Sequence, residues 1–292
     1  MEITIAIIYS TIHALTPLLI AGIGELISEK SGTLNLGIEG MMLMGCISGF
    51  IMSLITGNIL IGFIMAALTG MMLASLFAFF VLILRANQVV FGLSLTIFCT
   101  GLSAFLGQKY IGVPLDGLSN INIYFLSDLP IIGKLLFSHD LLVYLAFVLL
   151  FASQYFLYHS HAGLILRAVG ENHDVAHAFG YSVIKIRFYA LMFGGAMAGI
   201  AGAYLSLVYT PLWAENMTSG RGWIVLALVI FSMWRPYRLL FGAFLFGFAS
   251  IAQLFLQVSD SVLQIIPTEF FTMLPYLATL IALVYISSRK SK

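Results

Sequence analysis

Residues 59–84 read ILIGFIMAALTGMMLASLFAFFVLIL and contain no charged side chain. A helix that crosses a bilayer needs about 20 mostly apolar residues, and this run is longer than that. A helix that is apolar on every face is buried among other helices or in lipid. The run therefore predicts a transmembrane helix.

The composition extends this prediction to the whole chain of 292 residues. Hydrophobic residues make up 61% of it and charged residues only 9%, whereas a soluble domain has about 25% charged residues. A chain with so many apolar residues cannot cover its own core with polar surface, which excludes a soluble globular protein. The net charge of +1 excludes a broad basic surface for nucleic acid. We expect an all-α, polytopic membrane protein with a single transmembrane domain over residues 1–292.

Nine apolar runs are candidates for membrane-spanning helices. They comprise residues 3–24, 36–55, 59–84, 89–107, 141–158, 188–209, 222–234, 239–257 and 270–287. The run 222–234 is short for a span, and a half-helix or a re-entrant piece is the alternative. Removing it would place Arg235 and Arg238 on the opposite side of the membrane from the basic C-terminal tail, against the positive-inside rule. We therefore predict about nine transmembrane helices.

The basic residues also predict the orientation. With nine spans and a cytoplasmic C-terminus, ten of the 13 Lys and Arg residues face the cytoplasm. These ten are Lys30, Arg85, Arg167, Lys185, Arg187, Arg235, Arg238, Arg289, Lys290 and Lys292, which leaves Lys109, Lys134 and Arg221 outside. The N-terminus would then lie outside. The first run is a retained span rather than a secretory signal, because no basic residue precedes Lys30.

Small residues recur every four positions in two of the runs. Gly45 and Gly49 share one helix face, as do Gly195 and Gly199, with Gly202 close by. Such faces let helix backbones approach closely in lipid. Tight packing within the chain is the expected use, and a dimer face between two subunits is the alternative.

The longest polar segment on the predicted cytoplasmic side covers residues 159–187. Within it, residues 171–180 read ENHDVAHAFG, a short helix with its own end signals. These signals are Glu171 or Asn172 as the N-cap, Asp174 in the first turn and Gly180 after the last turn. At about 1.5 Å per residue, such a helix is far too short to cross a membrane.

Val175 and Phe179 lie four residues apart and share a face of this short helix. From the residues alone, an ordinary connecting loop and a docking element are equally good interpretations. The second rests on shape, because a self-capped helix with an exposed aromatic side chain fits a groove on a soluble partner. A partner bound there would move the fifth and sixth spans.

A second polar cluster follows the first run. Asn35 and Glu39 are four residues apart on one helix face, at the entry of the second run. An ionisable side chain there is costly unless it faces a cavity, a partner or water. Glu39 therefore either borders a translocation path or caps a helix near the interface. Asn87 and Gln88, at the next cytoplasmic turn, form a similar patch with the same two interpretations.

On the outside, four residues precede or begin the short run 222–234. They are Glu215, Asn216, Arg221 and Trp223. Glycines among them allow a sharp re-entry, and Trp suits the membrane interface. Anchoring at the interface is the default interpretation, and a lip of the substrate entrance is the alternative.

Several functions are disfavoured by motifs that the sequence lacks. It contains no G-x-x-x-x-G-K-[ST], HExxH or GxSxG pattern, so it has no P-loop of its own and no recognisable hydrolase site. The spans also lack the central Asp or Lys that ion-coupled carriers often use. Cys46 and Cys99 lie in apolar runs and form neither a disulfide framework nor a metal site.

Long segments of the chain resemble ABC-importer permeases for nucleosides and simple sugars, a family that also includes ribose and branched-chain amino acid permeases. Residues 34–45, LNLGIEGMMLMG, resemble the family's N-terminal signature. Further resembling segments are residues 86–96, 166–172, 215–236 and 273–277. Because these long motifs occur in the family's order over nearly the whole chain, the resemblance is specific.

The resemblance implies one subunit of a multi-part importer in a bacterial cytoplasmic (inner) membrane, closest to the shorter permease of guanosine or purine nucleoside importers. Two permease chains, identical or paralogous, would form the pore. Two cytosolic ATPase subunits would bind ATP and Mg²⁺, and an extracytoplasmic binding protein would deliver the substrate. The permease itself would bind no cofactor or metal and would not be an enzyme.

The resemblance also implies a role for residues 171–180, which occupy the position of a coupling helix that sits in an ATPase groove. Permeases for simple sugars such as ribose or galactose, or for a vitamin such as riboflavin, share the scaffold and are the alternatives within the family. A secondary carrier that works alone is the alternative from another class.

Overall fold

The computed structural model describes residues 2–118, 137–258 and 273. Within these ranges it contains ten α-helices, which confirms the all-α prediction. The helices are α1 (Glu2–Lys30), α2 (Ile38–Thr56), α3 (Ile59–Ala78), α4 (Gln88–Gly107), α6 (Leu141–His159), α7 (His161–Glu171), α8 (His173–Ala178), α9 (Val183–Tyr204), α10 (Arg221–Phe231) and α11 (Pro236–Val258). The π-helical turns η1 (Phe79–Ile83) and η3 (Leu205–Tyr209) extend α3 and α9, and the 3-10 turn η2 (Gln108–Tyr110) follows α4.

Seven helices in the described ranges are long and apolar enough to cross a membrane. They are α1, α2, α3, α4, α6, α9 and α11, with their short extensions. α10, in the predicted run 222–234, has 11 residues and rises roughly 16 Å, about half the thickness of the hydrocarbon core. The predicted run 270–287 lies outside the described residues, apart from residue 273.

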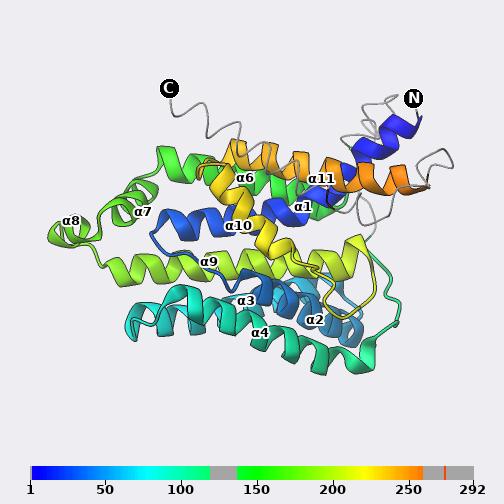
Figure 1. The fold of residues 1–292 in the computed structure, drawn as a ribbon, viewed down its shortest axis with the longest axis horizontal. Helices are drawn as coiled ribbons and strands as arrows, with labels where there is room; N and C mark the ends of the chain where they lie inside the picture. Colours follow the sequence, from blue (N-terminus) through cyan, green and yellow to red (C-terminus); the bar gives the residue numbers. More distant parts are fainter. Residues whose placement is uncertain (1, 119–136, 259–272, 274–292) are drawn as a thin grey trace.

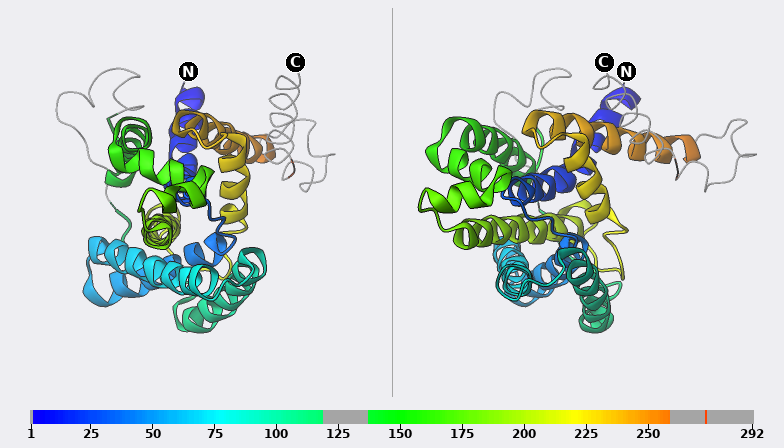
Figure 2. Two further views of the ribbon diagram at one scale, coloured as in Figure 1. Left: turned by 90° about the vertical axis from the view of Figure 1, so that its left-hand side faces the viewer. Right: turned by 60° about the vertical axis from the view of Figure 1, so that its left-hand side comes forward.

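α9 lies at the centre of the molecule (Figure 2). It packs against α1 on one side and against α2 and α3 on the other. α6 and α11 join α1 to form one layer, while α4 joins α2 and α3 to form the second. The chain is thus a helical bundle of two layers built around one central helix.

The close packing around α9 depends on glycine. A Cβ atom on Gly45 of α2 would overlap the backbone of Gly199, and one on Gly70 of α3 would overlap the backbone of Gly195. Hydrophobicity does not drive helices together in lipid, so contact between backbones is an important source of association. The expected use of these small residues in packing within the chain is confirmed.

One end of the bundle gathers the basic residues. α1 and α6 end there, α4 and α9 begin there, and α7 and α8 project from it (Figure 1). We call it the α8 end. Seven of the residues predicted on one membrane face belong to or adjoin the ends of the elements that meet there, with Arg167 and Arg235 close to Lys30; they are Lys30, Arg85, Arg167, Lys185, Arg187, Arg235 and Arg238. Arg289, Lys290, Lys292 and Lys134 lie outside the described residues.

Two segments run from the ends of the bundle toward its middle (Figure 1). Residues 31–37 leave α1 at the α8 end and turn back before α2 begins. Residues 210–220 leave η3 at the opposite end and run inward before α10 begins. α2 and α10 therefore both start inside the bundle.

A buried carboxylate joins three helices near the opposite end. Asp140 caps α6, where its Oδ1 accepts hydrogen bonds from the backbone of Leu142 and Val143 at 2.8 and 3.1 Å. Its Oδ2 accepts one from the Tyr204 hydroxyl at 2.9 Å and lies 3.3 Å from Nδ1 of His13. The single Asp140 side chain thus connects α6 to α9 and α1.

The glycine packing yields a stability prediction. In Gly199→Leu, the new side chain would collide with the Ala66 carbonyl of α3. Overpacking costs about 1–3 kcal/mol or more, and each kcal/mol lowers the unfolding midpoint by roughly 2–4 °C in a chain of this size class. We expect a fall of several degrees in detergent, measured by loss of the monodisperse chromatographic peak on heating.

Gly101→Leu is the matched control, because a Cβ at Gly101 on the exposed face of α4 meets nothing within 4 Å. This variant should have the same unfolding midpoint as the wild type. Equal melting of all three proteins would contradict the close backbone contact.

Candidate translocation and coupling sites

The Glu39 carboxylate meets the start of α10 in the middle of the bundle. Glu39 is only 4% exposed. Its Oε1 accepts hydrogen bonds from the Thr218 hydroxyl at 2.5 Å and from the Gly220 N–H at 2.9 Å. Its Oε2 accepts one from the Gly222 N–H at 2.5 Å. A negative charge at a helix N-terminus is favourable, so Glu39 holds the first turn of α2 against the first turn of α10.

Glycine makes this contact possible. Gly220, the N-cap of α10, has a φ of +80°, which other residues rarely adopt. A Cβ on Gly222 would lie 2.6 Å from the Cα of Glu39, so a larger residue would push the two helix starts apart. We call the contact between Glu39 and residues 218–222 the Glu39 junction.

The sequence predicts that Glu39 and Arg221 lie at opposite faces of the membrane, Glu39 at the cytoplasmic boundary and Arg221 outside. In the structure, Arg221 lies between the two glycines that contact Glu39. The difference arises because each run was assumed to begin at a membrane surface. Residues 31–37 and 210–220 instead carry the starts of α2 and α10 inward from opposite ends.

Asn35 organises the segment that leads to Glu39. It is fully buried, and its Oδ1 accepts a hydrogen bond from the Gly37 N–H at 3.0 Å, just before α2 begins. Its own N–H donates to Oε1 of Glu25 at 3.0 Å. Asn35 therefore shapes the backbone rather than facing open solvent.

Glu25 is a buried acidic residue to which the sequence reading assigned no role. It is 0% exposed, and its Oε2 has no hydrogen-bond partner among the described residues. A carboxylate directly after the first apolar run, residues 3–24, was the available signal, since a charge in the membrane requires a partner. The backbone N–H of Asn35 meets that requirement in part.

Gln88 reaches the same segment, whereas Asn87 does not. The Gln88 side chain accepts a hydrogen bond from the Leu34 N–H at 3.3 Å. Thr96, two turns further along α4, donates to the Leu36 carbonyl at 3.1 Å. Asn87 is exposed and caps α4 by accepting from two backbone N–H groups of its first turn. α4 thus anchors residues 31–37 through side chains.

The predicted external residues separate into two groups. Arg221 and Trp223 lie in the first turn of α10, where Nη1 of Arg221 donates to the Met217 carbonyl at 3.0 Å. The Arg221 guanidinium also lies over the Tyr209 ring, 5.7 Å from its centroid. Glu215 and Asn216 are exposed in the preceding segment, residues 210–220. Only the first pair adjoins the Glu39 junction.

α8 has the end signals that the sequence predicts. Oδ1 of Asn172 accepts hydrogen bonds from the N–H groups of Asp174 and Val175, both at 3.1 Å. Gly180 has a φ of +85° and follows the last turn. Its N–H donates to the His177 carbonyl at 2.9 Å. The short helix at this position is therefore confirmed, from His173 to Ala178.

The surface of α8 is apolar in part and exposed. Phe179 is 78% exposed and Val175 is 50% exposed, whereas Ala176 is 3% exposed. Glu171 and Asp174 are also exposed, and the 3.4 Å pair of Asp174 with His173 is too solvated to contribute much. Exposed aromatic and β-branched side chains on a projecting helix are suited to a protein contact.

The arm formed by α7 and α8 is joined to residues 31–37. A Cβ on Gly170 of α7 would overlap the Lys30 carbonyl, so the two backbones are in close contact. From α9, Nε of Arg187 donates to the Ser31 carbonyl at 3.0 Å. The segment that ends at the Glu39 junction thus begins in contact with the arm.

Comparison with known proteins identifies a family for the chain. Residues 7–283 match the family described as branched-chain amino acid transport system, permease component. A putative glucose ABC transporter permease protein of Haloferax volcanii, TsgC13, is 42% identical over 258 residues, which are 87% of this chain and 78% of that protein. No solved structure matches the chain significantly.

Two further relatives have names that refer to nucleosides. The nucleoside ABC transporter permease protein NupC of Lactococcus lactis is 32% identical, with 92% of this chain and 88% of that protein covered. The guanosine ABC transporter permease protein NupQ of Bacillus subtilis is 29% identical, with 97% and 92% covered.

These matches confirm the resemblance to ABC permeases that the sequence motifs indicate. A permease component is a non-catalytic transport subunit that works with ATPase and binding-protein partners. The chain is therefore a multi-pass membrane protein, and it belongs to the family of branched-chain amino acid transport system permease components, which are subunits of ABC transporters.

Proposed function

We propose that the chain is the pore-forming permease of an ATP-driven importer for nucleosides. The family match carries the proposal. Nucleosides are favoured because the relatives named for them align with 92% and 97% of this chain. A simple sugar is the second candidate, because the relative named for glucose has the higher identity of 42%. Both substrate classes carry a sugar ring with several hydroxyl groups.

The α8 end is proposed to face the cytoplasm of a prokaryotic cell. The seven basic residues gathered there support this orientation through the positive-inside rule. The N-terminus is then outside and the C-terminus inside. The permease pairs with a second permease, identical or paralogous, and with two ATPase subunits that bind ATP and Mg²⁺. A binding protein delivers the substrate from outside.

Residues 171–180 are proposed to couple the permease to an ATPase. Val175 and Phe179 insert into a groove of that subunit, while Asn172 and Gly180 fix the ends of the helix. Exposed Glu171 and Asp174 are placed to meet basic residues at the rim of the groove. Movement of this arm passes to residues 31–37 through the contact of Gly170 with Lys30.

The Glu39 junction is proposed to border the translocation path. Both oxygens of Glu39 already accept hydrogen bonds, so Glu39 acts by holding α2 and α10 together rather than by binding substrate. Asn35 and Gln88 hold the segment that positions it, and Asn87 lies at the cytoplasmic boundary. Glu215, Asn216, Arg221 and Trp223 are proposed to form the approach from outside.

The coupling role is tested with Phe179→Asp. Loss of a central aromatic anchor typically costs about 2 kcal/mol or more, which weakens binding about 30-fold. We expect this variant to insert normally but to lose most of its co-purifying ATPase and its uptake activity. His177→Asp is the matched control, because it adds the same charge at another exposed position of α8. Normal uptake by Phe179→Asp would refute the coupling role.

The path role is tested with Glu39→Gln. An amide accepts hydrogen bonds at only one of its two polar atoms, so a buried N–H group of α10 loses its acceptor, at a cost of about 1–3 kcal/mol. We expect the complex to assemble, with uptake reduced by about tenfold or more at unchanged ATPase binding. Asp116→Asn, a change at an exposed acid in the loop after α4, should have no effect. Full uptake by Glu39→Gln would show that the junction is not needed for transport.

The substrate is tested by uptake of labelled guanosine into vesicles that contain the complete complex, ATP and the binding protein. We expect unlabelled nucleosides to compete and glucose to have no effect, because a binding site that pairs with a nucleobase loses those contacts with a sugar. Glucose uptake without guanosine uptake would select the second candidate. Uptake by the permease alone, driven by an ion gradient, would overturn the proposal of an ATP-driven importer.

A further inference from the structure

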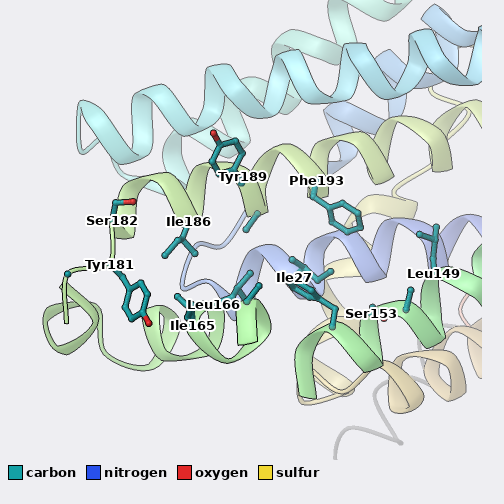
Figure 3. A pocket seen from close by; sticks show the side chains of 15 residues that line it. Ile27, Leu149, Ser153, Ile165, Leu166, Tyr181, Ser182, Ile186, Tyr189 and Phe193 are labelled. Carbon is teal, nitrogen blue, oxygen red and sulfur yellow. The ribbon is translucent and has the colours of Figure 1, made fainter. Parts of the chain in front are cut away.

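A large cavity lies between the arm and the bundle at the α8 end. It has a volume of about 720 Å³ and is lined by residues of α1, α6, α7 and α9 and of the turn before α9 (Figure 3). Side chains that surround it include Ile27, Leu149, Phe156, Leu166, Tyr189 and Phe193. This volume is in the range of sites that hold small organic ligands.

The walls of the cavity suit an apolar occupant. Its side chains with polar atoms are the hydroxyl-bearing Ser153, Tyr181, Ser182 and Tyr189. The Ser153 hydroxyl is already engaged, since it donates to the Leu150 carbonyl of its own helix at 2.8 Å. The other lining residues are aliphatic, aromatic or glycine, so most of the wall offers water no side-chain partner. The cavity is therefore unfavourable for water and favourable for hydrocarbon.

The cavity is lined in part by two candidate membrane-spanning helices, α6 and α9. It opens beside the exposed apolar face of α6. Its residues 149–156 and 186–193 belong to the candidate spans of α6 and α9. Tyr189 at its edge is 68% exposed. Val148 and Phe151, on the outer face of α6, are 61% and 58% exposed. The hydrocarbon that reaches such an opening in a membrane is the acyl chain of a lipid.

A basic residue lies in α9 between the cavity-lining residues Ser182 and Ile186. Lys185 is exposed and precedes Tyr189 by one turn of α9, on the side of the α8 end. Arg187, the next basic residue, is already bound to the Ser31 carbonyl. A lysine near the membrane surface attracts the phosphate of an anionic lipid. The charge and the apolar cavity are thus arranged in the order of a phospholipid headgroup and its tail.

We propose that this cavity binds one acyl chain of a membrane phospholipid, preferably an anionic one, whose phosphate lies beside Lys185. The lipid fills the wedge between α7 of the arm and α9 of the bundle. The site depends on the membrane location of the chain and is independent of the transported substrate.

The test uses the assembled complex in phosphatidylcholine vesicles that contain a minor fraction of phosphatidylglycerol with a photoreactive acyl chain. After illumination, mass spectrometry identifies the labelled peptides. We expect labelling of residues 149–156 and 186–193 to exceed that of the lipid-facing residues Ile97 and Phe98 on α4 by about tenfold. Labelling of the cavity residues no greater than that of α4 would overturn the proposal. Absence of labelling in the assembled complex, because a partner subunit covers the opening, would also overturn it.

Cavity-filling variants make the test specific. Ala152→Trp, from α6, and Ala162→Phe, from α7, both place bulk in the cavity and should abolish the excess labelling. Val148→Trp is the matched control, since Val148 lies on α6 one turn from Ala152 and does not face the cavity. Unchanged labelling in both filled variants would refute the site.

The headgroup preference is tested separately with Lys185→Ala. We expect several-fold less labelling by the photoreactive phosphatidylglycerol and no change with a photoreactive phosphatidylcholine of the same chain. Equal labelling by the two lipids in the wild type would contradict the role of Lys185.

Discussion

The Glu39 carboxylate joins two helices that begin inside the bundle, and this contact makes the unusual course of the chain possible. A helix that starts away from water leaves its first N–H groups without solvent partners, and hydrocarbon offers none. Glu39 supplies acceptors to the N–H groups of Gly220 and Gly222 and to the Thr218 hydroxyl. These hydrogen bonds satisfy donors at the start of α10, a helix of only 11 residues.

The remaining helices form a rigid frame around that contact. α9 brings Gly195 and Gly199 against the backbones of α3 and α2, and such packing has no space for side chains to shift. The arm is different, because α8 has only Ala176 among its buried residues. Changes of shape are thus more easily accommodated by the arm than by the centre of α9.

The sequence predicted features that depend on neighbours in the chain. Asn172 and Gly180 mark the ends of α8 because capping involves residues within one turn, and the spacing of Gly195 and Gly199 indicates a packing face for the same reason. The Glu39 junction was not predictable in this way, since Glu39 and Gly222 are 183 positions apart. A prediction from hydropathy also assumes that each apolar run starts at a membrane surface. Residues 31–37 instead lead inward, so that α2 starts inside the bundle.

Residues 31–37 connect the arm to the junction, and their anchoring explains how a distant movement can reach the middle of the membrane. The segment begins and ends in turns, at residues 31–32 and 36–37. Arg187 holds the segment at Ser31, and Glu25 holds it at Asn35, close to the start of α2. These two anchors belong to α9 and α1, whereas the arm contacts the chain at Lys30, directly before the segment, through Gly170. Under the proposed coupling, a push on Phe179 therefore reaches Glu39 along the backbone, and the permease needs no charged relay of its own across the bilayer.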